Sequence, residues 1–258
     1  MKTIHSVLLF FVAAAQSWAQ LSSVGAELWS KYNVPTPSQA EIFEQFHSNQ
    51  FIPVNKPLER PAGESISVAR LRHRPPGKAV EMFGRGIKAA SKGEWLQSQQ
   101  EFQRAVGLDP EFSEAFGNLG VTDVALGLFD SAARNLRRAI ELDPATGVHH
   151  LNYACALTKL NRDREAELEA QTAVALDPGN SAAHYLLGFL LGQRPETRGK
   201  AVDQLTEAAR QLPEAHYILA QIYRVQGDEF AAKQEMQTFE RLMPGEVPAT
   251  DTLHVKFR

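Results

Sequence analysis

Three histidines recur at one position of a repeated sequence pattern and are the side chains best suited to bind a metal ion. His150, His184 and His216 stand 34 and then 32 residues apart. Imidazole nitrogens bind zinc at about 2 Å, so three rings share an ion only where the fold gathers them at one point. The spacing puts each histidine on a separate helical unit, and packed helices lie roughly 8–10 Å apart. We therefore expect no metal site and interpret the three rings as interior packing residues.

The single cysteine, Cys155, excludes an intramolecular disulfide and any zinc or iron–sulfur site built from cysteines. Its thiol could cross-link to a partner, but a lone cysteine on an amphipathic helix more often packs as a small buried hydrophobe. Gly84, Gly86 and Gly199 lack the spacing of a phosphate-binding loop, and the signatures HExxH and GxSxG do not occur. The sequence thus predicts no catalytic residue, no cofactor and no enzymatic activity.

The composition is that of an ordinary folded protein. Of 258 residues, 43% are hydrophobic and 22% are charged, and the formal net charge is −3. A chain without an excess of positive charge has no general attraction for nucleic acid or for an anionic membrane surface. We expect neither of them as a partner.

The first 19 residues predict a secretory signal peptide. One cation, Lys2, precedes nine consecutive apolar residues from Val7 to Ala15, and the segment ends with small residues up to Ala19. Nine apolar residues are too few to span a bilayer, which needs about 20. We expect cleavage near Ala19, export to the periplasm or the secreted space, and no integral membrane span.

An internal repeat dominates the rest of the chain. The tripeptide Leu-Asp-Pro occurs at residues 108–110, 142–144 and 176–178, always 34 residues apart. Two less regular copies follow, the fourth closed by Pro213 and the fifth by Pro244. The five predicted copies are residues 79–112, 113–146, 147–180, 181–212 and 213–246, followed by a tail at residues 247–258.

Each copy contains two amphipathic helices joined by a short turn. In the second copy Ala132, Leu136 and Ala139 follow the i, i+4, i+7 spacing of a helix, and Asp130 is expected to cap this helix. In four copies the first helix is expected to end at a residue that tolerates a positive φ. These residues are Gly93, Gly127, Asn161 and Gly227.

These features resemble the tetratricopeptide repeat family over residues 79 to about 246. The resemblance rests on a small residue in the first helix, an alanine that opens the second helix and a closing proline. The small residues are Gly86, Gly120, Ala154, Gly188 and Ala220, and the alanines are Ala132, Ala166, Ala201 and Ala232. The resemblance implies an all-α fold, a right-handed superhelical solenoid of about five helix pairs in which each pair packs on its neighbours. Ser98 departs from the pattern, because it replaces the alanine in the first copy.

Residues 20–78 differ from the array, since seven prolines interrupt them and no repeat appears. Ser38 and Glu41 form a capping-box signature for a short helix at about residues 39–49. We expect an irregular, proline-rich segment with this one short helix. The basic residues at 70–78 are interpreted as solvated chain rather than as an anion-binding site.

A second apolar stripe along the first helices is the sequence feature that suggests a function. It consists of Val80, Phe83, Ile87, Val121, Val124, Val148, Leu151, Cys155, Tyr185, Phe189 and Tyr217. In the family that the chain resembles, the corresponding face lines a concave groove that binds peptides or helices. Three interpretations remain open: the stripe binds a segment of another protein, the chain's own residues 20–78 cover it, or it packs first helices against one another.

We therefore expect a non-catalytic protein–protein interaction scaffold or adaptor that binds a peptide or partner segment in an apolar groove. Some members of the family that the chain resembles bind a C-terminal carboxylate with Lys, Arg and Asn side chains of the groove. In this chain the corresponding groove positions are mainly apolar, which disfavours binding of a C-terminal carboxylate. The alternative is a structural subunit of an envelope, secretion or pilus assembly machine. An enzyme without a recognisable motif is the less favoured third possibility.

Overall fold

The structure is a computed structural model that describes residues 73–243, and every regular element in this range is helical. In chain order the elements are α5 (Gly77–Ala90), α6 (Trp95–Leu108), α7 (Ser113–Ala125), α8 (Phe129–Leu142), α9 (Gly147–Lys159), α10 (Asp163–Leu176), α11 (Ser181–Gly192), the 3-10 helix η1 (Pro195–Thr197), α12 (Arg198–Ala209), α13 (Glu214–Gln226) and α14 (Glu229–Leu242). The predicted all-α solenoid of five helix pairs is therefore confirmed. The predicted signal peptide, the short helix at 39–49 and the tail at 247–258 lie outside the described residues.

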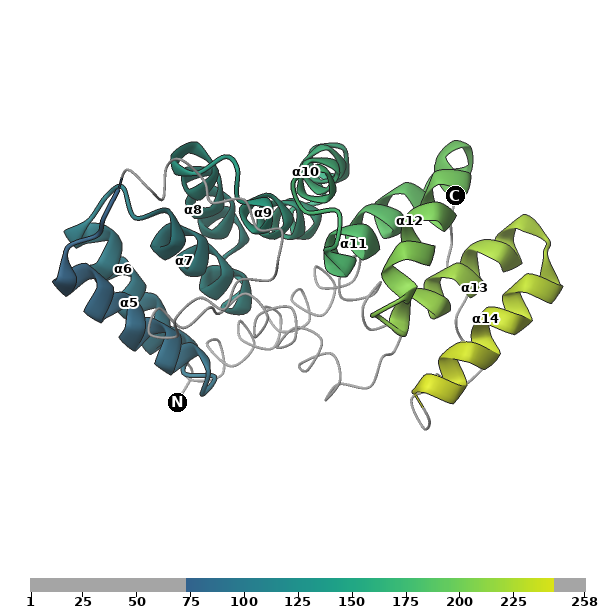
Figure 1. Ribbon diagram of the computed structural model, residues 1–258, viewed down its shortest axis with the longest axis horizontal. Helices are drawn as coiled ribbons and strands as arrows, with labels where there is room; N and C mark the ends of the chain where they lie inside the picture. The colour runs from purple at the N-terminus through teal and green to yellow at the C-terminus, as the bar shows by residue number, and fades with distance from the viewer. Residues whose placement is uncertain (1–72, 244–258) are drawn as a thin grey trace, which may run out of the picture.

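The α-helices pack as five antiparallel hairpins that stack side by side into an arch (Figure 1). Within each hairpin the first and second helices are the closest neighbours, from α5 with α6 to α13 with α14. Each second helix also packs against the first helix of the next hairpin. A hairpin can bury its remaining face only against such a neighbour, so the array is stabilised by stacking. Within residues 73–243, no helix combines the length and the apolar character that crossing a membrane requires.

Four turns between the helices of a hairpin depend on a left-handed backbone conformation. Gly93, Gly127 and Gly227 have φ angles of +71°, +74° and +83°, and Asn161 has +58°. Glycine adopts this conformation without a Cβ clash, and asparagine tolerates it better than most residues. No other residue of the described range has a positive φ, so the predicted conformation of these four residues is confirmed. Only Gly227 directly follows its helix, because α5, α7 and α9 end two or three residues earlier.

The prediction that Asp130 caps the second helix of its hairpin is wrong. The turn after α7 is so short that α8 begins at Phe129, which leaves Leu128 at the capping position without a side-chain bond. Asp130 lies in the first turn instead, where a negative charge favours the helix dipole. Side-chain caps occur at Asn180 before α11 and at Asp228 before α14.

In three hairpins a glycine of the first helix faces a large side chain of the second helix. A Cβ added at Gly120 would lie only 2.5 Å from Cγ of Leu136, so this position requires glycine. The same close approach is found for the pairs Gly86–Phe102 and Gly188–Leu205. In the third hairpin both equivalents, Ala154 and Ala170, are small and fully buried.

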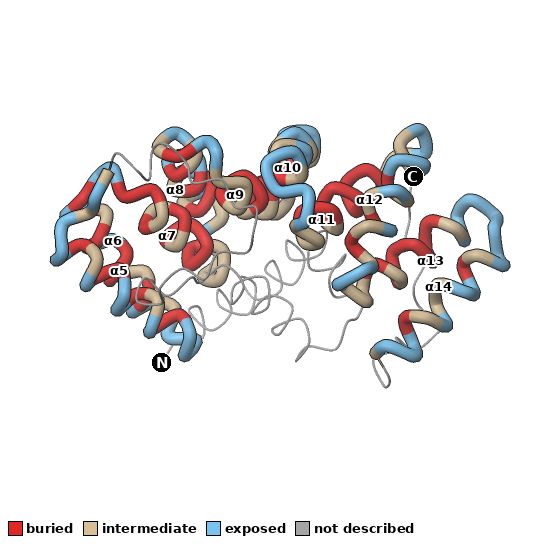
Figure 2. Tube along the Cα trace, viewed as in Figure 1, coloured by how far each residue is buried: buried red, intermediate tan, exposed pale blue. Residues whose placement is uncertain are grey.

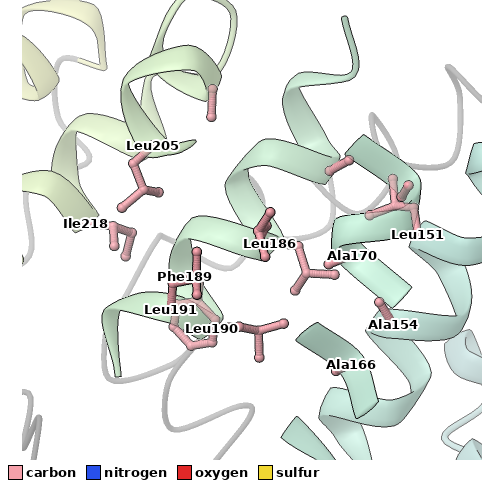
Figure 3. Packing of buried hydrophobic residues seen from close by; sticks show 14 of the residues in the cluster. Leu151, Ala154, Ala166, Ala170, Leu186, Phe189, Leu190, Leu191, Leu205 and Ile218 are labelled. Carbon is pink, nitrogen blue, oxygen red and sulfur yellow. The ribbon is translucent and has the colours of Figure 1, made fainter. Parts of the chain in front are cut away.

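Buried residues occur in all five hairpins, as the red segments of the tube show (Figure 2). A large apolar cluster extends from α8 to α14, and a smaller one joins α5, α6 and part of α7. Figure 3 shows leucines and alanines of the larger cluster meeting across adjacent helices. At the boundary between the clusters α7 carries buried polar residues. Asp123 accepts a 2.8 Å hydrogen bond from Asn135, and the hydroxyls of Thr122 and Ser98 lie 3.3 Å apart.

Both ends of the array carry charged side chains at positions that are uncharged inside it. Helix α11 buries Leu187 and Leu190, whereas the equivalent residues of α5, Arg85 and Lys88, are exposed. At the other end, Glu240 of α14 is exposed, although its equivalents in the inner second helices are Val, Ile or Ala. The first and last hairpins therefore carry charges at positions where the inner hairpins pack against a neighbour.

The fourth hairpin contains a longer turn that contacts the preceding hairpin. Arg194, just before η1, donates a 2.6 Å hydrogen bond to Glu167 of α10. The hydroxyl of Thr197 closes the turn by bonding the carbonyl of Leu191. The inserted turn thus links the third hairpin to the fourth.

Candidate partner-binding face

All residues of the predicted apolar stripe lie on first helices. We call Val80, Phe83, Ile87, Val121, Val124, Val148, Leu151, Cys155, Tyr185, Phe189 and Tyr217 the first-helix stripe. In Figure 1 the helices α7, α9 and α11 lie toward the inner side of the arch, below α8 and α10. The stripe therefore follows one side of the array, but its members are buried to different degrees.

Five members of the first-helix stripe belong to the protein interior. They are Phe83, Val121, Leu151, Phe189 and Tyr217. The ring of Phe83 lies 4.9 Å from that of Phe112, in the linker to α7, and the ring of Tyr217 lies 5.5 Å from that of Phe239 in α14. Rings at these separations attract one another beyond the area that they bury. For these five residues the packing interpretation applies.

The other six members are half-exposed and offer an apolar surface. They are Val80, Ile87, Val124, Val148, Cys155 and Tyr185. Ile87 packs on the smaller apolar cluster, and Val124, Cys155 and Tyr185 pack on the larger one. All six are only partly exposed, and the thiol of Cys155 and the hydroxyl of Tyr185 are themselves buried. The accessible surface therefore runs along four consecutive first helices, from α5 to α11.

The stripe is interrupted on α7 by a contact between adjacent hairpins. Gly117 stands where the neighbouring hairpins carry Phe83 and Leu151. A Cβ at Gly117 would lie 2.7 Å from Cε1 of His149, whose buried ring reaches over from α9. His149 supplies the bulk that Gly117 lacks and packs α9 against α7. In the sequence, only the glycine at 117 in one copy and the additional histidine at 149 in the next copy could have indicated this contact.

Burial suppresses the acid–base chemistry of the polar members of the stripe. It raises the pKa of the Cys155 thiol to about 12, and the nearby charge of Lys159 offsets only part of this effect. The pKa of Tyr185 is also raised, first by burial and then by the charge of Glu214. The reactive form of a cysteine is its thiolate, so Cys155 is a poor nucleophile near neutral pH. Its environment fits the role of a packing residue.

Each of the three repeated histidines bridges the two helices of its own hairpin. The Nδ1 atoms of His150, His184 and His216 lie 2.7, 2.8 and 2.6 Å from side-chain oxygens of Glu169, Gln204 and Glu235, respectively. The rings fill the interior slot of each hairpin, with a hydrogen bond that the sequence pattern did not predict. Within the part of the chain that the structure describes, no group of three or more His, Cys, Asp or Glu side chains is placed to hold a metal ion.

Comparison with known proteins relates one hairpin to a named family. Residues 113–146 match the family model described as Tetratricopeptide repeat. The Protein STIP1 homolog of Dictyostelium discoideum is 32% identical over 103 residues, which are 40% of this chain and 18% of that protein. The chain therefore spans less than a fifth of the length of this curated relative.

Two solved structures share the fold at low sequence identity. MamA from Desulfovibrio magneticus RS-1 aligns with a TM-score of 0.58 at 16% identity, over 66% of this chain and 99% of that chain. YrrB, described as a TPR protein with an unusual peptide-binding site, aligns with a TM-score of 0.55 at 18% identity, over 65% of this chain and 87% of that chain.

Five stacked hairpins with a small residue at each helix crossing define a helical-repeat solenoid. More particularly, the second hairpin matches the tetratricopeptide repeat model over residues 113–146, and the described part of the chain shares its fold with the two solved structures. Solenoids of this class present extended surfaces through which they bind other proteins.

Proposed function

We propose that this protein is a non-catalytic scaffold that holds a segment of another protein against the half-exposed residues of the first-helix stripe. The observation that carries the proposal is the partly exposed apolar surface of the first helices of four consecutive hairpins, formed by Val80, Ile87, Val124, Val148 and Tyr185. The partner segment would be mainly apolar, because these positions offer no series of cations for a carboxylate or a phosphate. The charged ends of the array support a partner that binds along its side.

Site-specific photo-crosslinking tests this proposal. A photoreactive amino acid is placed at Val124 or Val148, and at Leu168 as the matched control. Leu168 is also apolar and 64% exposed, but it lies on α10, a second helix. We expect cross-links to a partner protein from Val124 and Val148 and none from Leu168. Equal cross-linking from all three positions would contradict the proposed face.

Charge substitution provides an independent measurement of the same surface. Val148→Glu introduces a charge into the half-exposed surface, and Leu168→Glu introduces the same charge outside it. We expect Val148→Glu to weaken capture of the cross-linked partner by about tenfold or more, which corresponds to about 1.4 kcal/mol. Leu168→Glu leaves capture unchanged. Buried members such as Leu151 are unsuitable for this test, since their replacement removes core packing.

The chain's own residues 20–78 are the second candidate occupant of the face. One contact favours this alternative: Nε2 of His73, just before α5, lies 2.7 Å from Oδ2 of Asp109, between α6 and α7. His73 is thus held against the linker that follows α6. Mass spectrometry of the Val148 cross-links in the full chain distinguishes the occupants, because an internal occupant yields peptides from residues 20–78 instead of a partner.

We also propose that the protein acts after export, as the predicted signal peptide suggests. N-terminal sequencing of the protein from its native source is expected to find Gln20 as the first residue, and an intact Met1 would contradict export. A role as a structural subunit of an envelope, secretion or pilus assembly machine is the alternative to a binary scaffold. It predicts that the protein elutes in one large complex when a native extract is fractionated by size.

A further inference from the structure

One repeat position of the first helices carries two carboxylates and no cation. In the five copies this position is held by Val80, Glu114, Val148, Ala182 and Glu214, and all five residues are half-exposed. Val80 and Val148 belong to the half-exposed part of the first-helix stripe, so the repeat places Glu114 and Glu214 on the same face. The face therefore combines apolar side chains with negative charge.

Glu214 lies beside two tyrosines of the stripe. Tyr217 follows it by three residues on α13, so both side chains share one side of this helix. Tyr185 stands at the repeat position of Tyr217 on α11, the first helix of the preceding hairpin, and α11 contacts α13. The charge of Glu214 reaches across this contact, since it raises the pKa of Tyr185 further than burial alone does. We call Tyr185, Glu214 and Tyr217 the Glu214 cluster.

The Glu214 cluster offers the groups that attract a cation. The carboxylate supplies a negative charge, and the half-exposed ring of Tyr185 supplies an aromatic face. Burial raises the pKa of Tyr217 to about 12 and also raises that of Tyr185, so both phenols stay neutral near pH 7. The ring of Tyr217 packs 5.5 Å from that of Phe239 in α14, which supports the cluster from the last helix.

The other charges on the two helices are few. Helix α11 contains no Asp, Glu, Lys or Arg, and α13 contains only Glu214 and Arg224. Arg224 stands ten residues after Glu214, which corresponds to about 15 Å along the helix axis. Its charge offsets part of the rise in the pKa of Tyr217. On α14, Glu235 lies 2.6 Å from Nδ1 of His216. The end of α13 that faces Tyr185 is therefore the negative end.

We propose that the Glu214 cluster binds a lysine or arginine side chain of the partner segment. This inference rests on the proposed function, because it adds a charged anchor to the mainly apolar segment held by residues such as Val148. The cation lies over the ring of Tyr185 beside the carboxylate of Glu214, and it fixes the register of the segment along the array. Glu214 also favours the dipole of α13, as Glu114 does in α7, but that role creates no preference for a basic ligand.

Two matched probe peptides test the cluster in the full wild-type chain. One is an acetylated and amidated peptide of three leucines and a final arginine, and the other carries citrulline, the neutral isostere of arginine, in its place. Tyrosine ring signals in ¹³C NMR spectra report binding at Tyr185 and Tyr217. We expect the arginine peptide to bind about three- to tenfold more tightly than the citrulline peptide. Equal affinities, or signal changes that miss both tyrosines, would overturn the proposal.

Glu214→Gln is the matched test in the protein. It is expected to remove the preference for the arginine peptide and to leave binding of the citrulline peptide unchanged. The control is Glu207→Gln on α12, a second helix, where the carboxylate pairs with Arg210 at 2.8 Å. This control is expected to keep the preference. A preference that survives in Glu214→Gln would show that Glu214 has only a structural role.

The peptide measurement needs no natural partner, so it fails independently of the photo-crosslinking experiment. Absence of a partner at Val124 and Val148 contradicts the proposed function and leaves the arginine preference in place. Cross-linking to a partner without an arginine preference contradicts the Glu214 cluster alone.

Discussion

The contact between Gly120 and Leu136 gives a quantitative test of what holds a hairpin together. Leu136 is fully buried, so Leu136→Ala leaves a cavity and is expected to cost about 2–5 kcal/mol of unfolding free energy. Gly120→Ala places a methyl group 2.5 Å from Cγ of Leu136 and 3.2 Å from the carbonyl oxygen of Ala132. This overpacking costs about 1–3 kcal/mol, from which about 1 kcal/mol is recovered because alanine favours the helix.

The double variant Gly120→Ala/Leu136→Ala is expected to be more stable than the sum of the single changes predicts. The new methyl group enters space that the leucine side chain has left, as in the third hairpin, where Ala154 and Ala170 meet without a large residue. We expect a favourable coupling free energy of about 1–3 kcal/mol, because the two residues are in direct contact.

Urea unfolding followed by circular dichroism measures the four free energies. Gly84→Ala is the matched control, since Gly84 also lies within a helix but an added Cβ there meets nothing within 4 Å. This control is expected to gain about 0.5–1 kcal/mol. Two results would contradict size matching as the reason for a glycine at position 120. One is that Gly120→Ala gains as much unfolding free energy as the control, and the other is that the effects of the two substitutions simply add in the double variant.

Three further predictions concern single residues. Burial raises the pKa of Cys155 to about 12, so the thiol stays protonated at about pH 8. We therefore expect its alkylation, followed by mass spectrometry, to be roughly 100-fold or more slower in the folded protein than in the urea-unfolded protein. Ala139→Leu enlarges a fully buried side chain and is expected to cost about 1–3 kcal/mol in urea unfolding, so an unchanged thermal midpoint would contradict the repeat register. Gly227→Ala forces alanine to a φ of +83° and is expected to cost about 1 kcal/mol or more of unfolding free energy in the same urea assay. Gly107→Ala is the control and costs nothing, because an added Cβ there meets open space.

Much of the fold could be predicted because its rules are local and repeated. One copy of the repeat is enough to recognise the residue with positive φ after a first helix, as at Gly127 and Asn161. The same holds for the glycine opposite a large side chain, as at Gly120. The start of α8 was missed because polar side chains near a helix end do not fix its first residue. Asp130 favours the helix from inside the first turn as well as from the capping position.

The candidate site could be predicted only in part. Helical spacing places Val148 and Leu151 on one face of α9. It does not predict that Leu151 is fully buried while Val148 stays half-exposed. That difference depends on how far the neighbouring helices reach over each residue. The packing of His149 on Gly117 and the bond of His150 to Glu169 join different helices, so no pattern within one helix contains them.

The charged residues at the two ends of the array disfavour its extension by further copies. Identical solenoids with apolar end faces would add to one another head to tail and grow into open filaments. Joining this array in that way would bury Arg85 and Lys88 at one end and Glu240 at the other, and removing such charges from water is costly. Arg85 and Lys88 would meet the opposite charge of Glu240, but for a buried pair the desolvation cost can exceed this attraction. We therefore expect the two end faces of the described array to disfavour head-to-tail growth, so that partners bind more readily along its sides.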